Sequence, residues 1–400
     1  MLRSILSPIM KKVRLKRGQE RRLFGGSLWV FSNQIDDPIK DYLPGEIVRV
    51  TQRNGKFLGV GYMNPHSLIA VRILTRDDRD IDRRFFLDRF QAAKALRDKI
   101  LPGEAAVREV FSESDGLPGM VLDRYADQFV LQISTVGMDQ LKTLIVDCVH
   151  EIYQPASLYE RSDLSARRLE GLEPVTGLIS GSNPDQPLWV NFASVQLPVD
   201  IVCGQKTGLY LDQRCNLEQI AAIARGGAVL DAFSYVGTWG LKAARAGAER
   251  VIFLDSSQWA LDQAMKAARR NRVAAVCRSL KSDAFPALQQ FALENQLFDL
   301  IILDPPSFIQ SRSRFKDGYK GFFDLNQRAM RIIKPGGFLV SCSCSHLLGE
   351  AEFNDMLLAA ANRNGRKFLL LYKGRQGPDH PVLPSMPETE YLHCSVLRFD

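Results

Sequence analysis

The spacing of hydrophobic and polar residues predicts a small β-rich domain at the start of the chain. Between Val13 and Arg76, short apolar runs are separated by turn residues such as Gly, Pro, Asn and Asp. The dipeptide Asn54-Gly55 lies between two alternating runs, 46–50 and 57–62. Asn-Gly is a preferred pair for a two-residue hairpin turn. We therefore expect closely spaced strands that form a small barrel.

A second pattern, with a helical period, begins at Asp82. Apolar residues recur at helical spacing as far as Leu101, and Pro102-Gly103 ends the run. From Val107 to Gly177, strand-like runs alternate with one helix over about 138–152, which predicts a small mixed α/β unit. The polar, proline-rich residues 184–187 predict a linker after this unit.

From about Val190 the pattern changes to strands that alternate with helices. This alternation is typical of a parallel sheet with crossover connections, so we predict a doubly wound, Rossmann-like α/β domain. The predicted strands are 228–232, 251–254, a third strand that ends before Asp283, 300–303 and 338–342. The predicted helices are 217–224, 237 onward, 257–271 and 322–333. The chain is thus expected to contain three domains, at 1–80, 81–187 and 188–400.

The net charge of the chain resides at its start. The 400 residues carry 52 Lys and Arg against 45 Asp and Glu, a net charge of +7, and residues 1–22 hold eight of these bases and one acid. All other residues balance at 44 against 44. A basic segment on a neutral body suits a polyanionic partner such as nucleic acid, and a solvated basic strand is an equal alternative.

Targeting and redox features are sparse. No apolar run reaches the roughly 18 residues that a transmembrane helix needs, and the apolar residues within 1–10 are too few and too scattered for an export signal. The seven Cys include no Cys-x-x-Cys pair, so neither a disulfide framework nor a zinc site is expected. These features predict a cytoplasmic protein with reduced thiols and no membrane partner.

The residues that follow the predicted strands are the candidate binding residues, because ligands of doubly wound sheets bind beyond the carboxyl ends of the strands. After the first strand, 231–240 resembles only the tail of a G-x-G-x-x-G fingerprint, with Tyr235 in place of the first Gly. This loss disfavours a dinucleotide and suits S-adenosylmethionine, which has no phosphate. Asp255 and Asp283 follow the next two strands and are expected to bind ribose hydroxyls and an adenine amino group. Either carboxylate alone is more often a helix cap or a turn residue.

Asp304-Pro305-Pro306 follows the fourth predicted strand. The two prolines restrict the backbone, so the Asp304 carboxylate is expected to hold the N3 and N4 edge of a cytosine, with Phe308 available to stack on a base. The alternative is a rigid turn beside a core Phe. Residues 311–334 carry seven bases and two acids. They predict a basic loop that tracks a phosphate backbone, or else the solvated face of a helix.

The fifth predicted strand ends with Cys342 and Cys344, followed by His346. A thiolate can add to C6 of a pyrimidine and make C5 electron-rich enough to accept a methyl group. Packing is the more usual role of a buried Cys. We expect no metal here, because two or three such close ligands do not complete a tetrahedral set.

Together these residues resemble the bacterial 23S ribosomal RNA cytosine-C5 methyltransferase family, which joins a PUA domain to an S-adenosylmethionine-dependent methyltransferase domain. The resemblance covers nearly the whole chain. It rests on Trp29-Val30-Phe31, Asn64-Pro65, residues 113–119, Asp123-Arg124, Arg161-Ser162-Asp163, residues 206–214, the loop after the first strand, Asp304-Pro305-Pro306, the Cys-Ser strand end, Asp379-His380-Pro381 and Tyr391-Leu392.

The resemblance implies a PUA-like RNA-binding domain at 1–80, a central α/β domain at 81–187 and the methyltransferase domain at 188–400. It implies 23S ribosomal RNA or its precursor as the partner, and a homodimer is compatible with the sequence. The residues expected to bind S-adenosylmethionine are Tyr210, Asp212, Gln213, Asp231, Phe233, Ser234, Gly237, Asp255, Ser256, Asp283, Ala284 and Asp304.

In that family the nucleophile is the Cys of a Ser-Cys-Ser triplet, and the register from Gly336-Gly337 selects Cys344 rather than Cys342. The implied mechanism is addition of Cys344 to C6 of a flipped-out cytosine held by Asp304, methylation at C5, and loss of the C5 proton with release of the thiolate. The sequence does not identify the base that takes this proton. Two alternatives are an RNA base N-methyltransferase that uses Asp-Pro-Pro without a covalent intermediate, and a non-catalytic RNA-binding assembly factor.

Overall fold

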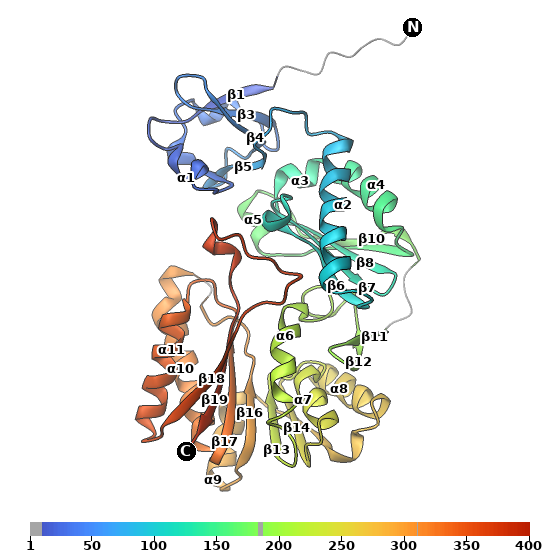
Figure 1. The fold of residues 1–400 in the computed structure, drawn as a ribbon, viewed down its shortest axis with the longest axis vertical. Coiled ribbons are helices and arrows are strands. Elements are labelled where there is room, and N and C mark those ends of the chain that lie inside the picture. Colours follow the sequence, from blue (N-terminus) through green and yellow to red (C-terminus); the bar gives the residue numbers. More distant parts are fainter. Residues whose placement is uncertain (1–9, 183–186, 310) are drawn as a thin grey trace.

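The structure is a computed structural model that describes residues 10–182, 187–309 and 311–400. Figure 1 shows the elements stacked along one long axis, with the N-terminal strands at one end, a second sheet in the middle and the largest sheet at the other end. In the part of the chain that the structure describes, no helix is long and apolar enough to cross a membrane. The predicted linker at 184–187 lies mostly outside the described residues.

The N-terminal domain is a five-stranded sheet in the order β1-β3-β4-β5-β2. As predicted, Asn54-Gly55 connects an antiparallel hairpin, formed by β3 and β4. The elements are β1 (Lys11–Arg14), α1 (Arg21–Phe24), β2 (Trp29–Phe31), β3 (Ile47–Thr51), β4 (Phe57–Met63) and β5 (Ile69–Thr75).

The predicted N-terminal basic segment contributes β1, Lys11–Arg14, to this sheet, and Arg21 and Arg22 lie in α1. Lys11 pairs with Glu46 at 3.1 Å and Arg14 with Asp37 at 2.6 Å. These two bases are therefore not a free arm, and Arg3 lies outside the described residues.

The middle domain is a second five-stranded sheet, in the order β10-β9-β8-β7-β6, with α2 and α4 packed against it. The Asp82 side chain caps α2 by accepting a hydrogen bond from the Phe85 N–H at 2.9 Å. The elements are α2 (Arg83–Ile100), β6 (Ala106–Phe111), β7 (Met120–Tyr125), β8 (Gln128–Ile133), α3 (Val136–Gln140), α4 (Lys142–Tyr153), β9 (Ser157–Ser162), α5 (Ala166–Leu169) and β10 (Val175–Gly181).

The largest sheet has seven strands in the order β15-β14-β13-β16-β17-β19-β18. Its first five strands are parallel, and β19 runs antiparallel to both of its neighbours. The elements are β13 (Ala228–Ala232), α7 (Thr238–Arg245), β14 (Arg250–Asp255), α8 (Gln258–Arg270), β15 (Cys277–Lys281), α9 (Ala284–Leu293), β16 (Phe298–Leu303), α10 (Phe315–Arg331), β17 (Ile333–Ser343), α11 (Glu350–Arg363), β18 (Phe368–Gly374) and β19 (His393–Phe399).

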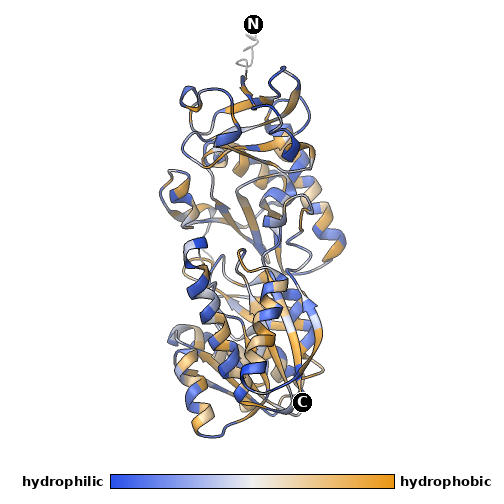
Figure 2. Ribbon diagram, turned by 90° about the vertical axis from the view of Figure 1, so that its left-hand side faces the viewer, coloured by the Kyte–Doolittle hydropathy of each residue, from blue (hydrophilic) through white to orange (hydrophobic). Residues whose placement is uncertain are grey.

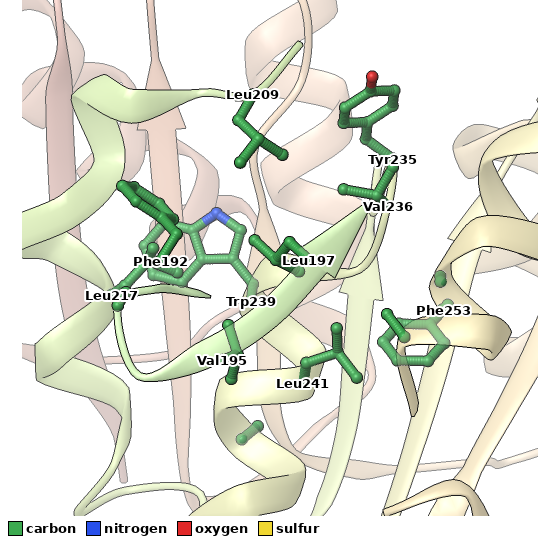
Figure 3. Close-up of a cluster of buried hydrophobic side chains, with 14 of the residues drawn as sticks. Phe192, Val195, Leu197, Leu209, Leu217, Tyr235, Val236, Trp239, Leu241 and Phe253 are labelled. Carbon is green, nitrogen blue, oxygen red and sulfur yellow. The ribbon is translucent and has the colours of Figure 1, made fainter. Parts of the chain in front are cut away.

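Helices cover both faces of this sheet, which confirms the doubly wound prediction. One core contains α7, α8 and the hairpin of β11 (Leu188–Phe192) and β12 (Val195–Val199). Figure 3 shows part of it, with Phe192, Val195 and Leu197 beside Trp239 and Leu241. The other core contains α9, α10 and α11. Figure 2 shows that the helices at this end of the molecule carry both hydrophobic and hydrophilic residues, as expected for helices that cover a sheet.

Two predicted helices differ from the structure. The apolar spacing at 217–224 comes from buried, irregular chain rather than one helix, because α6 covers only Arg214–Leu217 and a short 3-10 turn follows. Helix α10 begins at Phe315, so much of the predicted basic loop is helical. A side chain at Gly318 would come within 2.5 Å of the Phe308 carbonyl oxygen, so this glycine permits close packing rather than marking a loop.

The segment 375–392, between β18 and β19, joins the three sheets. Figure 1 shows it extending from the largest sheet toward the N-terminal domain. At its tip, Met386 is 1% exposed and its sulfur accepts a hydrogen bond from the Leu28 N–H at 3.4 Å. Nearer its start, the Asp379 carboxylate accepts a hydrogen bond from the Arg108 N–H of the middle domain at 3.1 Å.

Candidate active site at the carboxyl ends of the largest sheet

A cavity of about 430 Å³ opens where β13, β14, β16 and β17 end. Nine of the predicted site residues line it, and residues between β12 and α7 complete its wall. The lining consists of Gln205, Lys206, Tyr210, Asp212, Gln213, Leu217, Phe233, Ser234, Tyr235, Thr238, Trp239, Asp255, Ser256, Asp304, Pro305, Pro306, Ser307, Cys344 and Leu392.

The loop after β13 has a strained backbone. Phe233, Tyr235 and Gly237 adopt positive φ angles of 64°, 48° and 84°, a region that non-glycine residues rarely occupy. The Tyr235 N–H donates to Asp255 Oδ2 at 2.8 Å, so the carboxylate at the end of β14 fixes the turn. The other oxygen of Asp255 accepts from the Ser257 N–H at 2.9 Å. The loop is thus held against the cavity by the residue that was predicted to bind ribose.

Four predicted cofactor residues do not line the cavity. Asp231 is fully buried, and its Oδ2 accepts a hydrogen bond from the Gly240 N–H at 2.8 Å. This hydrogen bond fixes the turn that leads into α7. Burial raises the pKa of Asp231 to about 8. Gly237 lies at the N-cap position of α7. Asp283 and Ala284 form the start of α9, where the Asp283 backbone is extended as at other helix N-caps.

Asp304 lies on the cavity wall and accepts hydrogen bonds from two side chains. Gln213 Nε2 donates at 3.0 Å to one carboxylate oxygen, and Trp239 Nε1 donates at 3.0 Å to the other. Burial raises the pKa of Asp304 to about 6. A carboxyl group with such a pKa exchanges its proton near neutral pH, as a general acid must.

The two cysteines at the end of β17 have different surroundings. Cys342 is 1% exposed and pairs in register with Cys394 of β19, so it belongs to the core. Cys344 follows the last residue of the strand and faces the cavity, with its sulfur 4.0 Å from the Pro305 carbonyl oxygen. Burial raises the pKa of the Cys344 thiol to about 11. Of the two cysteines, Cys344 is therefore the one that faces the cavity.

Phe308, which was expected to be free to stack on a base, is packed instead. Its ring lies 4.7 Å from that of Phe322 and 6.3 Å from that of Phe285, measured between ring centroids. It does not line the cavity. The core alternative for Phe308 was correct, because α10 starts early enough to cover it.

The segment 205–213 supplies a polar wall. Lys206 Nζ lies 2.8 Å from Asp212 Oδ2, and Tyr391 Oη donates to the same oxygen at 2.7 Å. Lys206 lowers the pKa of Asp212 against the opposing effect of burial. Sequence reasoning did not assign Lys206 to the site. The only sequence feature that could have identified Lys206 is its place in the motif at 206–214. This motif lies before β13 in the sequence, so it does not follow a strand of the largest sheet as the other candidates do.

Two polar atoms at the cavity suit a polar ligand. Ser234 Oγ and Asp212 Oδ1 are buried, and neither has a hydrogen-bond partner among the described residues. Unpaired buried oxygens are costly, so a ligand that donates or accepts there is favoured. The apolar walls formed by Phe233 and Leu217 suit an adenosine or a thioether chain. No group of three His, Cys, Asp or Glu that could hold a metal occurs in the described parts of the chain.

Comparisons with known sequences identify two of the domains and the relatives of the chain. Residues 13–76 match the family described as PUA-like domain, and residues 179–387 match the family described as S-adenosylmethionine-dependent methyltransferase. Over 391 residues the chain is 37% identical to ribosomal RNA large subunit methyltransferase I of Vibrio vulnificus (strain YJ016), with 96% of this chain and 98% of the relative covered. The Aliivibrio fischeri (strain MJ11) protein of the same name is 37% identical over 388 residues, with the same coverage.

Two solved structures share the fold. A candidate S-adenosylmethionine-dependent methyltransferase from Streptococcus mutans superposes with a TM-score of 0.84 at 20% identity, over 97% of this chain and 100% of that one. A candidate methyltransferase complexed with SAH superposes with a TM-score of 0.86 at 19% identity, with the same coverage. The predicted PUA-like domain, Rossmann-like fold and S-adenosylmethionine cofactor are therefore confirmed. The chain belongs to the ribosomal RNA large subunit methyltransferase I family.

Proposed function

We propose that this protein methylates C5 of a cytosine in 23S ribosomal RNA, through a covalent adduct between Cys344 and C6. The observation that carries this proposal is that Cys344 and Asp304 face one cavity, which the loop after β13 also lines. The relatives are named as large-subunit ribosomal RNA methyltransferases, which supports the substrate class. A ribosomal RNA substrate places the reaction in the cytoplasm.

We assign the cofactor to the part of the cavity lined by Phe233, Ser234, Asp255 and Ser256. When bound, S-adenosylmethionine supplies the methyl group that is transferred. The unpartnered Ser234 Oγ is available to a polar group of the cofactor. Both oxygens of Asp255 already accept backbone N–H groups, and each has a further lone pair for a ribose hydroxyl.

Asp304 holds the target base. In its protonated form the carboxyl group donates to N3 of cytosine and accepts from the N4 amino group, which the ionised form cannot do at N3. With a pKa of about 6, about a tenth of the molecules are protonated at pH 7. Gln213 and Trp239 fix the orientation of the carboxyl group before the base arrives. A proton donated to N3 makes C6 of the cytosine more electrophilic.

Cys344 acts as the nucleophile. Its thiolate forms a bond to C6 while N3 takes the proton from Asp304, and the resulting enamine carbon, C5, takes the methyl group. A base then removes the C5 proton, the N3 proton returns to Asp304, and the C5–C6 double bond forms again as the thiolate leaves, so the enzyme is regenerated. The contact between Cys344 and the Pro305 carbonyl keeps the sulfur on the same side of the cavity as Asp304.

RNA contacts are assigned to two surfaces. The PUA-like domain supplies one. The other is the start of α10, where Arg312, Arg314, Lys316 and Lys320 are exposed. Phe315 and Tyr319 stack there with their ring centroids 6.1 Å apart. Bases and aromatic rings together suit single-stranded RNA.

The rival function is methylation of an exocyclic amine, in which Asp304-Pro305-Pro306 would position the amine and no Cys would be needed. RNA that contains 5-fluorocytidine distinguishes the two, because fluorine at C5 cannot leave as a proton does and the C6 adduct persists. Wild-type protein and Cys342→Ala are expected to form an RNA adduct that survives denaturing electrophoresis, and Cys344→Ala to form none. An adduct with Cys344→Ala would exclude Cys344 as nucleophile.

The substrate is tested in cells with and without the protein. Mapping of 5-methylcytosine in 23S ribosomal RNA is expected to show one position that loses the modification in the absence of the protein and regains it with wild type. An unchanged 5-methylcytosine pattern with a lost N-methyl group would favour the rival function. Unchanged modification of every kind, together with no binding of S-adenosylmethionine in calorimetry, would favour a non-catalytic assembly factor.

A further inference from the structure

We propose that Lys206 is a positioning residue for methyl transfer, whose ammonium group supplies the positive charge that supports the Cys344 thiolate. This inference rests on the proposed function, because it takes Cys344 to be the nucleophile. Lys206 would not touch the cytosine in this role; it would act through the electrostatic field in the cavity.

The charges on the cavity wall show why a cation is needed. Three carboxyl groups line the cavity, those of Asp212, Asp255 and Asp304, and Lys206 is the single Lys or Arg among the described residues that line it. A thiolate that forms beside these acids is repelled by the ionised ones. A reactive thiolate requires a positive or hydrogen-bonded environment. Lys206 is the residue of this wall that provides the charge.

The Lys206 ammonium is held in place from two sides. Its Nζ lies 2.8 Å from Asp212 Oδ2 and 4.2 Å from the centre of the Tyr210 ring. The Asp212 oxygen also accepts the Tyr391 hydroxyl at 2.7 Å. The first contact pairs Lys206 with an opposite charge, and the second places its Nζ over the electron-rich face of the Tyr210 ring.

The backbone around Lys206 is fixed by the middle domain. Lys206 has a positive φ of 51°, a backbone conformation that is uncommon for residues other than glycine. The next residue, Thr207, is fully buried and donates from its hydroxyl to Asp123 Oδ2 at 2.6 Å. The Leu209 N–H donates to the Tyr125 hydroxyl at 3.1 Å. Two residues of β7 thus hold a strained loop that aims Lys206 at the cavity, and such strain is typical of functional positions.

The groups that act on Cys344 oppose one another. Burial raises the pKa of Cys344, Lys206 is the group that lowers it most, and Asp304 and Asp212 raise it further. The titratable and charged groups around the same cavity are Lys206, Tyr210, Asp212, Tyr235, Asp255, Asp304 and Cys344. Removal of the positive charge should therefore make the thiol harder to ionise.

A purely structural role for Lys206 predicts a different result. If Lys206 only anchored the loop through Asp212, any donor to Asp212 would serve, and the charge would not matter. Lys206→Gln keeps a donor without the charge, and Lys206→Arg keeps both. Lys334→Met is the matched charge control, because Lys334 pairs with Asp299 at 2.7 Å and does not line the cavity.

The test is the pH dependence of Cys344 alkylation by iodoacetamide in the full chain, followed by peptide mass spectrometry. The exposed Cys215 is the internal reference, and the buried Cys148 and Cys277 report any unfolding. In Lys206→Gln, Cys344 is expected to react roughly tenfold more slowly at pH 8, with its profile displaced to higher pH, since one pKa unit changes the thiolate fraction about tenfold. Lys206→Arg and Lys334→Met are expected to keep the wild-type profile.

The proposal is wrong if the Lys206→Gln profile overlays that of wild type, or if Lys334→Met displaces it equally. If Cys148 becomes reactive in Lys206→Gln, that variant has unfolded and Lys206→Arg is the test. A folded Lys206→Arg variant whose Cys344 alkylation profile is displaced from that of wild type also contradicts the proposal. These outcomes are separate from failure of the proposed function. The 5-fluorocytidine adduct tests Cys344 as nucleophile, whereas alkylation needs no RNA and no cofactor.

Discussion

At the scale of single residues, the cavity wall contains carboxyl groups whose environments shift their pKa values in opposite directions. Asp212 beside Lys206 has a lowered pKa, whereas burial raises that of Asp304 to about 6. Asp212 is therefore ionised under conditions in which Asp304 exchanges its proton. Groups with pKa values pushed apart in one site are suited to different roles, here a fixed anion and a proton donor.

Asp304→Asn should abolish proton donation to N3 while it keeps the size of the side chain. We expect methylation in a single turnover to slow by roughly 10²- to 10⁴-fold, the usual contribution of general acid catalysis. Asp299→Asn, at the opposite end of β16, is the control and should methylate at the wild-type rate. A folded Asp304→Asn variant within a few-fold of wild type would show that no proton passes through this residue.

Asp231 predicts how stability depends on pH. Its folded-state pKa of about 8 lies above its ordinary value, so folding takes up a proton between about pH 4 and pH 8. Stability should fall as pH rises through that window, by at most about 1.4 kcal/mol per pH unit from this group. Asp231→Asn stays neutral, so its free energy of unfolding in urea should fall less steeply from pH 5 to pH 8. Parallel curves for the two proteins would contradict the raised pKa.

At the scale of elements, the turn from β13 into α7 shapes the part of the cavity that we assign to the cofactor. Gly237 has a φ of +84°, and a Cβ there would lie 2.9 Å from Phe253 Cε1 and 3.0 Å from Ala264 Cβ. The turn therefore needs glycine for two reasons, its backbone conformation and its lack of space.

Gly237→Ala should lose about 1–3 kcal/mol of stability, from strain plus overpacking. It should also weaken the binding of S-adenosylmethionine, because Phe233 and Ser234 would shift with the turn. Gly226→Ala separates the two causes: its φ is +70°, but no atom lies within 4 Å of the added Cβ. Urea unfolding and calorimetry are the measurements. Equal losses in both variants, with unchanged cofactor binding, would show that packing at Gly237 is unimportant.

Strand ends were predictable because buried parallel strands are continuous apolar runs with a polar residue at the end. Strand β13 was predicted to the residue, and Asp255 and Asp304 were placed correctly at the cavity. Asp283 was not, because it lies at the N-cap position of α9, and the same sequence spacing fits a residue that faces a ligand and one at which a helix begins. Lys206 was missed because its loop is positioned by Asp123 and Tyr125, which are more than 80 residues away.

At the scale of the whole molecule, the segment 375–392 connects the PUA-like domain to the candidate active site. Its tip contacts the PUA-like domain through Met386 and Ser385, the latter donating to the Gly26 carbonyl oxygen at 3.2 Å. Its end carries Tyr391, which donates to Asp212 in the cavity wall. The PUA-like domain and the cavity wall are thus both in contact with this one segment.

The exposed bases at the start of α10 predict one place where RNA binding depends on salt. Lys11 and Arg14 are already paired within the PUA-like domain, whereas Lys316 and Lys320 are exposed bases with no ion-pair partner among the described residues. Lys316→Gln with Lys320→Gln should weaken binding of a single-stranded 23S fragment and lower the slope of log K against log salt by about 1.4, at about 0.7 for each RNA phosphate that is no longer neutralised.

The matched control removes two exposed bases from α8, which covers the opposite face of the largest sheet. Lys266→Gln with Arg269→Gln changes the net charge by the same amount, so the double variant should keep the wild-type slope in fluorescence anisotropy as the salt concentration is raised. If both pairs lower the slope equally, the RNA responds to overall charge, and the start of α10 is not its track. A reduced slope for the α10 pair alone locates the path of the RNA beside the helix that also covers Phe308.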